Sequence, residues 1–182
     1  MGKEGEKEEE KSAVHSPLIL YVDGGCSNNG YRNSRGGIGI FHAKDSPFNR
    51  SERLPACFDP ATNEKAELYA AIRALKMTTL FKMENVEIRS DSEYLIHGML
   101  EWIQRWKRNG WITANRKPVK NKELWIMLES VVRELPTKVT WTKVKGHSAD
   151  CGNEWADDLA QRAVYTADSD NSVGTNFVML SF

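Results

Sequence analysis

The chain has 182 residues and a mass of 20.7 kDa, and its composition, 40% hydrophobic and 27% charged, is typical of a globular protein rather than a disordered one. No apolar run approaches the roughly 20 residues of a membrane span, so we expect a soluble protein. The 25 basic residues balance 25 acidic ones, and this net charge of zero argues at first against a polyanionic partner. Three scattered cysteines, none in a CxxC pair, favour reduced thiols and an intracellular location, cytoplasmic or nuclear.

Charge and apolar content divide the chain into three parts. Residues 1–16 are rich in glutamate and lysine and lack large apolar residues before Val14, which predicts a disordered charged tail. Residues 17–166 carry the hydrophobic patterning and are predicted to form one folded domain. Residues 167–182 begin with a polar stretch and are assigned to a C-terminal tail.

The first half of this domain is expected to contain three strands and a long helix. Apolar runs separated by turn residues predict strands at 18–24, 36–43 and 51–58, in the order of an antiparallel meander. From Thr62 the apolar spacing changes to helical period, which predicts a helix to about Leu80. The residues that set this period are Leu68, Ala71, Ile72 and Leu75.

The second half alternates between the two element types. A strand is predicted at 86–92, helices at about 92–108 and 120–135, a strand at 138–144 and a final helix at 153–165. Three strands, a helix, a strand, helices, a strand and a helix predict an α/β fold, in which a mixed five-stranded sheet is flanked by helices.

Four acidic residues lie where predicted strands end or along predicted helices. Asp23 is at the exit of the first strand, Asp91 is at the end of the fourth, Glu67 is early in the long helix and Asp157 is in the last one. Adjacent strands would bring Asp23 and Asp91 to one edge of the sheet, and helices crossing that edge would add the other two. Such a group would repel itself unless hard divalent cations, Mg²⁺ or Mn²⁺, neutralised it.

Each acid also has a plainer interpretation when it is taken alone. Asp23 precedes two glycines and would suit a turn, Asp91 with Ser92 would cap the following helix, and Glu67 borders an apolar stripe where it would be solvated. Spacing alone leaves open whether Asp157 or its neighbour Asp158 turns inward. The four positions taken together favour a metal site.

At these positions the sequence resembles the type 1 ribonucleases H, enzymes that cut the RNA strand of RNA–DNA hybrids. The resemblance runs from about Leu18 to Val164. It rests on these motifs: YVDGGCSNNG, GGIGIF, TNEKAELYAAIRAL, SDSEYLIHG, WIQRWKRNGW, KPVKNKELW and VKGHSADCGNEWADDLAQRA. It implies the ribonuclease H fold and a domain that corresponds to the catalytic part of such proteins.

The resemblance also implies the roles of the acids. The metal-binding carboxylates of the family fall on Asp23, Glu67, Asp91 and Asp157, and its mobile-loop histidine falls on His147. Two Mg²⁺ ions, with Mn²⁺ as a substitute, would clamp the scissile phosphate, and the products would carry 5′-phosphate and 3′-hydroxyl ends. His147 would shuttle a proton or assist product release, because an unperturbed histidine titrates near pH 6.5.

A basic segment at residues 102–122 revises the first inference from net charge. It contains seven basic residues, no acidic residue and three tryptophans: Arg105, Lys107, Arg108, Arg116, Lys117, Lys120, Lys122, Trp102, Trp106 and Trp111. Residues 1–11 and 165–182 each carry a charge of −2, so the stretch between them carries +4. Basic side chains neutralise phosphates, and aromatic faces pack against sugars or bases.

The resemblance places substrate contacts in and around this segment. Trp102 would line a DNA-strand channel, with Lys107 and Arg108 in the basic grip, whereas Trp106 and Trp111 are interpreted mainly as packing residues. Thr62 and Asn121 match a pocket for a DNA-strand phosphate. Asn29 and Asn63 match contacts to ribose 2′-hydroxyls. Each of these four also suits a turn or a helix cap.

Three positions depart from the pattern of the family. Pro60 is near the place of a phosphate-binding arginine, Glu64 replaces a common amide and Ala114 replaces a residue that is polar in some members. A weaker grip on the minor groove is expected.

We expect a monomeric endonuclease acting on RNA–DNA hybrids, without a membrane partner. The alternative is a non-catalytic hybrid-binding module derived from a reverse transcriptase or a larger assembly.

Overall fold

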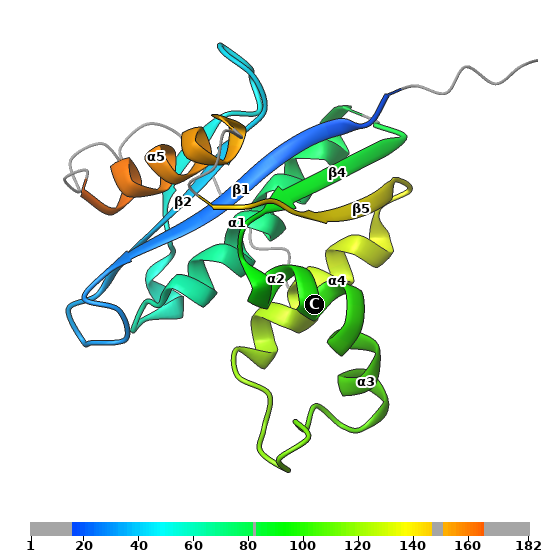
Figure 1. Cartoon of the computed structure of the whole chain (residues 1–182). Coiled ribbons are helices and arrows are strands. Elements are labelled where there is room, and N and C mark those ends of the chain that lie inside the picture. The colour runs from blue at the N-terminus through cyan, green and yellow to red at the C-terminus, as the bar shows by residue number, and fades with distance from the viewer. Residues whose placement is uncertain (1–15, 82, 147–150, 166–182) are drawn as a thin grey trace, which may run out of the picture.

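The computed structural model describes residues 16–81, 83–146 and 151–165, which form a mixed five-stranded sheet between helices (Figure 1). The strands are β1 Leu18–Ser27, β2 Arg35–Phe41, β3 Arg50–Arg53, β4 Asn85–Ser90 and β5 Lys138–Lys143. Their order across the sheet is β3-β2-β1-β4-β5. The pairs β1–β2 and β2–β3 are antiparallel, whereas β4 runs parallel to both β1 and β5. The predicted α/β class and the antiparallel meander are confirmed.

Helices cover the two faces of this sheet. On one face α1 (Asn63–Thr78) packs against β1 and β2, and α4 (Lys122–Glu134) packs against α1. On the other face α5 (Cys151–Tyr165) lies across β1, β2 and β3 (Figure 1). The chain between β4 and α4 forms α2 (Glu93–His97), a π-helical turn (Gly98–Trp102) and α3 (Ile103–Arg108), and with the loop after α3 it projects away from the sheet.

The hydrophobic core fills the layer between the sheet and α1. Alternate residues of β1, Leu18, Leu20 and Val22, are buried, as period-two patterning predicts. They pack in one cluster with fully buried residues of α1 such as Leu68 and Ile72. The amphipathic pattern in the sequence therefore fixes which face of α1 meets the sheet.

Two predicted elements differ from those observed. The strand predicted at 51–58 pairs only as far as Arg53, because Pro55 has no N–H for the ladder, and residues Ala56–Phe58 form a 3-10 turn instead. The helix predicted at 92–108 is interrupted by the π-helical turn. The tails predicted at 1–16 and 167–182 lie outside the described residues, apart from Ser16. None of the helices that the structure describes is long and apolar enough to cross a bilayer.

Candidate metal centre and nucleic-acid interface

Asp23 and Asp91 are brought together by two neighbouring parallel strands. In the β1–β4 pair Tyr21 lies beside Arg89, and each aspartate follows two residues further along its own strand direction. Asp91 follows the end of β4, whereas Asp23 lies within β1, which continues to Ser27 in its pairing with β2 and so extends beyond its predicted end at Gly24. Both aspartates lie just past the last pair of the β1–β4 ladder and therefore at the same edge of it. Asp23 is 9% exposed, and its Oδ1 accepts a hydrogen bond of 2.7 Å from the Gly24 N–H.

Glu67 reaches this edge because α1 contacts β1 directly. A Cβ atom at Gly24 would overlap the backbone of Ala66 and Glu67, so only glycine allows this close approach. The Ser92 hydroxyl then donates a hydrogen bond of 2.5 Å to Glu67 Oε2. Ser92 Oγ also accepts from the Leu95 N–H at 3.1 Å and so caps α2. The capping role considered for Ser92 is present, together with a contact to Glu67 that sequence reasoning missed.

Asp157 approaches from the opposite face on α5. Gly39 pairs with Asp23 across β1 and β2, and a Cβ at Gly39 would overlap the carbonyl group of Ala156, so α5 packs closely over the sheet at this point. Asp157 lies near enough to Asp23 to raise its pKa. Asp158 instead pairs with Arg162 one turn away. Of the two residues that spacing left open, Asp157 is therefore the one that lies near Asp23.

The electrostatics of the group reflect burial and mutual repulsion. Burial raises the pKa of Asp23 most, and the negative charges of Asp91, Asp157 and Glu67 add to the rise while the Gly24 N–H opposes it. Together these effects bring the pKa to about 7. Burial also raises the pKa of Glu67, and the Ser92 hydroxyl limits that rise. A carboxyl group with three acidic neighbours is stabilised as an anion when a cation binds among them.

The donor chemistry of these four residues fits hard divalent cations. Carboxylate oxygens are preferred ligands of Mg²⁺, which also keeps several waters and commonly shares its site with substrate phosphate. In the described part of the chain, no three acidic, histidine or cysteine side chains converge tightly enough to enclose an ion by themselves.

Two further groups border the acids. The Asn153 side chain is buried and its Nδ2 donates a hydrogen bond of 3.2 Å to Asp91 Oδ2, while its Oδ1 has no hydrogen-bond partner among the described residues. Gly146 packs so closely on Asp91 that a Cβ there would overlap the carboxylate. His147, the predicted proton-transfer residue, lies outside the described residues. The sequence pattern did not predict this contact of Asn153 with Asp91.

Three of the four predicted substrate contacts, Asn29, Thr62 and Asn63, lie at the start of α1, and the fourth, Asn121, precedes α4. Asn29 Oδ1, from the turn between β1 and β2, accepts a hydrogen bond of 3.1 Å from the backbone N–H of Asn63. Thr62 is the N-cap of α1, and its Oγ1 accepts from the Lys65 N–H at 3.2 Å. Asn121 precedes α4 in a left-handed conformation, with φ of 57°. The capping role considered for these residues is present at Thr62, whereas the Asn121 side chain makes no capping hydrogen bond.

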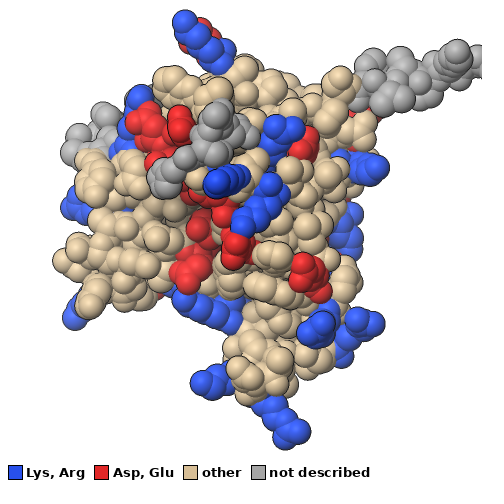
Figure 2. Space-filling model, in the orientation of Figure 1, with Lys and Arg blue, Asp and Glu red and all other residues tan. Residues whose placement is uncertain are grey.

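The basic segment 102–122 forms most of the projection below the sheet. Figure 2 shows lysine and arginine side chains on this projection, and acidic side chains in the middle of the same face. Six of its seven basic residues are exposed, and Lys122 is half-buried. Lys107 forms an ion pair with Glu129, so a phosphate would have to compete for it, whereas Arg108 Nε donates to the Gln104 carbonyl at 3.2 Å.

The tryptophans divide between packing and partial exposure. Trp106 is buried and packs on Trp125, as predicted, with ring centroids 5.4 Å apart. Trp111 is half-buried and also packs on Trp106, but from the loop after α3. Trp102 is half-buried and stacks on His97, with ring centroids 5.9 Å apart. Its partial exposure leaves it available to a ligand.

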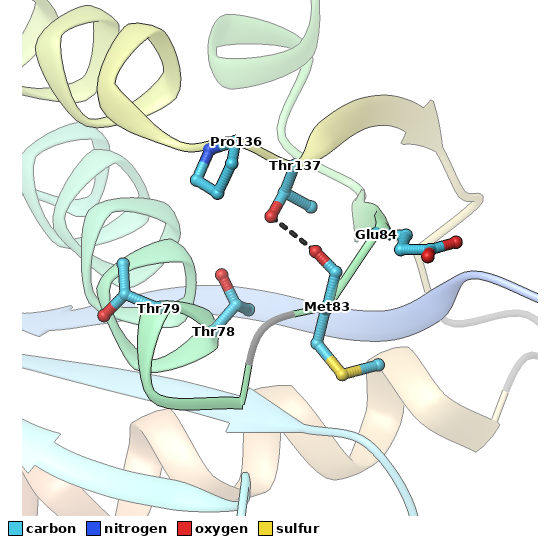
Figure 3. Close-up of a pocket in the computed structure, with 6 residues that line it drawn as sticks. All are labelled: Thr78, Thr79, Met83, Glu84, Pro136 and Thr137. Carbon is cyan, nitrogen blue, oxygen red and sulfur yellow. Dashed lines mark hydrogen bonds between the residues drawn. The ribbon is translucent and has the colours of Figure 1, made fainter.

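A separate apolar pocket of about 380 Å³ opens at the other end of the sheet (Figure 3). Glu84 and Thr137, which line it, immediately precede β4 and β5, whereas the four carboxylates lie toward the opposite ends of the parallel strands. The Thr137 hydroxyl donates to the Met83 carbonyl at 2.6 Å, and Glu84 points away from the pocket (Figure 3). This pocket is therefore distinct from the candidate metal centre.

Comparisons with known proteins agree with this arrangement. Residues 15–165 match the sequence pattern that defines the RNase H family. Ribonuclease H1 of Homo sapiens is 38% identical over 144 residues, which are 79% of this chain and 49% of the human protein. The chain thus spans about half the length of its mammalian relatives. Ribonuclease H of Francisella tularensis subsp. novicida is 41% identical over 147 residues, which are 81% of this chain and 90% of that protein.

A solved structure extends the comparison to three dimensions. LC11-RNase H1, crystallised in complex with an RNA/DNA hybrid, superposes with a TM-score of 0.58 and 25% identity, over 80% of this chain and 95% of its own. The sequence match covers the strands and helices that carry Asp23, Glu67, Asp91 and Asp157. This chain belongs to the RNase H family.

Proposed function

We propose that this protein is an endonuclease that hydrolyses the RNA strand of RNA–DNA hybrids and leaves 5′-phosphate and 3′-hydroxyl ends. The convergence of Asp23, Glu67, Asp91 and Asp157 at one edge of the sheet, beside a basic projection, carries this proposal. The hybrid bound to LC11-RNase H1 and the names of the curated relatives support the substrate.

The four acids would hold two Mg²⁺ ions, for which Mn²⁺ can substitute. When bound, such ions supply the activation of a water for in-line attack and the neutralisation of the leaving 3′ oxygen. The Ser92 hydroxyl and the Asn153 amide orient the Glu67 and Asp91 carboxylates from behind. His147 would move a proton to or from the reacting groups or assist the departure of product.

The substrate would lie across the acids and the basic projection. Asn29 and Asn63, joined by a hydrogen bond, would contact ribose 2′-hydroxyls and so distinguish the RNA strand. Thr62 and Asn121 would contact a phosphate of the DNA strand. Trp102, Lys107 and Arg108 would hold that strand further along. We also propose that the protein is a monomer and that it acts in the cytoplasm or the nucleus.

Cleavage assays with matched aspartate variants test the proposal. The purified protein should cut a labelled RNA–DNA hybrid in Mg²⁺, but not in excess chelator, and should leave duplex RNA and duplex DNA intact. Asp23→Asn should lower the rate by at least about 100-fold, because it removes a carboxylate ligand. Asp158→Asn, which changes the same residue type on the Arg162 side of α5, should stay near the wild-type rate.

Two results would contradict this function. Cleavage that persists in Asp23→Asn, or that spares the hybrid while another duplex is cut, would refute the assignment. A protein that binds the hybrid tightly in Mg²⁺ but never cuts it would be the non-catalytic binding module instead. The complete set of four acids favours the enzyme, since a binding module has no need of them.

A further inference from the structure

An ion pair joins the first turn of α1 to the residue that precedes Asn121. The Lys120 Nζ lies 3.0 Å from Glu64 Oε1, although the two residues are 56 positions apart in the sequence. The Glu64 side chain is 34% exposed and that of Lys120 is 62% exposed. Both residues therefore border the surface between Thr62 and Asn121, the two positions assigned to a DNA-strand phosphate.

Two neighbouring side chains donate hydrogen bonds to the Glu64 carboxylate. The Lys120 ammonium and, more weakly, the Thr62 hydroxyl hydrogen-bond to it and thereby lower the pKa of Glu64 below its usual value, against the effect of burial. Close by, Asn121 Nδ2 is buried without a hydrogen bond of normal geometry. An ammonium, a hydroxyl and an amide are the donor types that bind a phosphate oxygen.

These donors do not need Glu64 to hold them in place. The Lys120 carbonyl accepts a hydrogen bond of 2.9 Å from the Tyr94 hydroxyl, which in turn accepts one of 2.9 Å from Trp125 Nε1 in the core. Thr62 is fixed by its capping bond to the Lys65 N–H. Loss of the Glu64 charge would therefore release the Lys120 ammonium and leave the backbone that carries it anchored.

We infer that the Glu64 carboxylate is an internal substitute for a substrate phosphate, which occupies Lys120 and Thr62 in the free protein and weakens binding of the hybrid. This inference rests on the proposed function. An incoming phosphate must displace Glu64 from Lys120 and then stay beside its negative charge. An ion pair this exposed is weak enough to be displaced, so Glu64 lowers the affinity without blocking the site.

The Glu64→Gln variant tests the inference, with Glu123→Gln as its matched control. Glu64 and Glu123 are each the second residue of their helix, α1 and α4, so both substitutions remove one negative charge from the same helix position. Hybrid affinity would be measured by fluorescence anisotropy in chelator, where no cleavage occurs. We expect Glu64→Gln to lower the Kd by roughly three- to tenfold and Glu123→Gln by less than about twofold.

The Lys120→Gln substitution, made in the wild type and in Glu64→Gln, distinguishes two roles of the ion pair. Either Glu64 competes with a substrate phosphate for Lys120, or the pair only stabilises the two helix ends. In the wild-type background Lys120→Gln should weaken binding less than it does in the Glu64→Gln background, because a wild-type phosphate gains the Lys120 contact only by breaking the ion pair with Glu64. In the Glu64→Gln background it should abolish the gain. The dependence of log Kd on log salt should also steepen by nearly one in Glu64→Gln, since one more phosphate is neutralised. Thermal unfolding of each variant shows that the fold is retained.

The outcomes separate this inference from the proposed function. If the pair only braces the two helix ends, Glu64→Gln will weaken binding or match Glu123→Gln, and the inference is wrong even though the wild type cuts hybrid. If the wild type neither binds nor cuts hybrid, the proposed function fails and the inference fails with it.

Discussion

Burial and the charges of neighbouring acids together raise the pKa of Asp23. Its pKa is raised to about 7 from 3.8, first by burial and then by Asp91. A carboxyl group whose pKa is higher in the folded state binds its proton more tightly there, so its effect on stability is neutral below pH 3.8 and becomes destabilising as the pH rises to about 7. The metal-free protein should therefore lose stability over this interval.

Asp23→Asn should reverse that loss in the metal-free protein. At pH 8 in chelator we expect the variant to be more stable than wild type by up to about 4 kcal/mol, at about 1.4 kcal/mol for each unit by which the pKa is raised. Near pH 4 the difference should almost vanish. Urea unfolding at pH 4, 6 and 8 measures it, with Asp158→Asn as the control. Equal stability of variant and wild type at pH 8 would contradict the raised pKa of Asp23.

Ser92 joins a helix cap to a carboxylate through one hydroxyl. It accepts from Leu95 and donates to Glu67, so substitutions can remove one role and keep the other. Glycine is nearly as good an N-cap as serine, whereas alanine costs about 1 kcal/mol there. Ser92→Gly should therefore stay close to wild type in stability and lose only the bond to Glu67, while Ser92→Thr keeps both.

We expect Ser92→Gly to raise the Mg²⁺ concentration for half-maximal hybrid cleavage by about tenfold, because a hydrogen bond to a charged group contributes roughly 1.5–3 kcal/mol. A Mg²⁺ titration of cleavage rate, run beside Ser92→Thr and Ser92→Ala, measures this. If the half-maximal concentration moves only in Ser92→Ala, together with its stability, then Ser92 acts through the helix alone.

At the scale of elements, local pattern predicts most of the fold. The period-two run of β1 and the 3.6-residue period of α1 identify both elements, because each buries one face against the other. The hydrophobic pattern was wrong near Pro55, because proline has no N–H to donate to a neighbouring strand. The strand predicted at 51–58 is observed only at Arg50–Arg53. Trp111, which lies between the two predicted helices, packs on Trp106 as predicted.

The site was predictable as a set of positions and not as a set of contacts. Asp23 and Asp91 come together once β1 and β4 are neighbours, as expected, but β1 continues past Asp23 to Ser27, so only Asp91 lies at a strand end. The contacts of Ser92 with Glu67 and of Glu64 with Lys120 join residues 25 and 56 positions apart, and no local pattern encodes such distances. The inward turn of Asp157 depends on how α5 rotates over Gly39, which its own sequence does not specify.

At the scale of the whole molecule, net charge is a poor guide to partners because charges of opposite sign are separated in space. The sum of zero combines the acids at the sheet edge, of which Asp23 is buried, with the seven basic residues of the segment 102–122. A polyanion meets the local field within about a Debye length, roughly 8–10 Å at physiological salt, and not the sum over the chain. Cations bound among the acids would make the same face more favourable to phosphate.

Hybrid binding should therefore depend steeply on salt. If about five phosphates are neutralised, log affinity should fall with log salt with a slope of about −4 to −5, so a fourfold rise in salt costs several hundredfold. Replacing Arg116 and Lys117 by glutamine should reduce the magnitude of this slope by about two. Replacing Lys76 and Lys138, exposed at the other end of the sheet, should leave it unchanged. A flat salt response, or equal effects of the two pairs, would show that the basic projection does not hold the substrate.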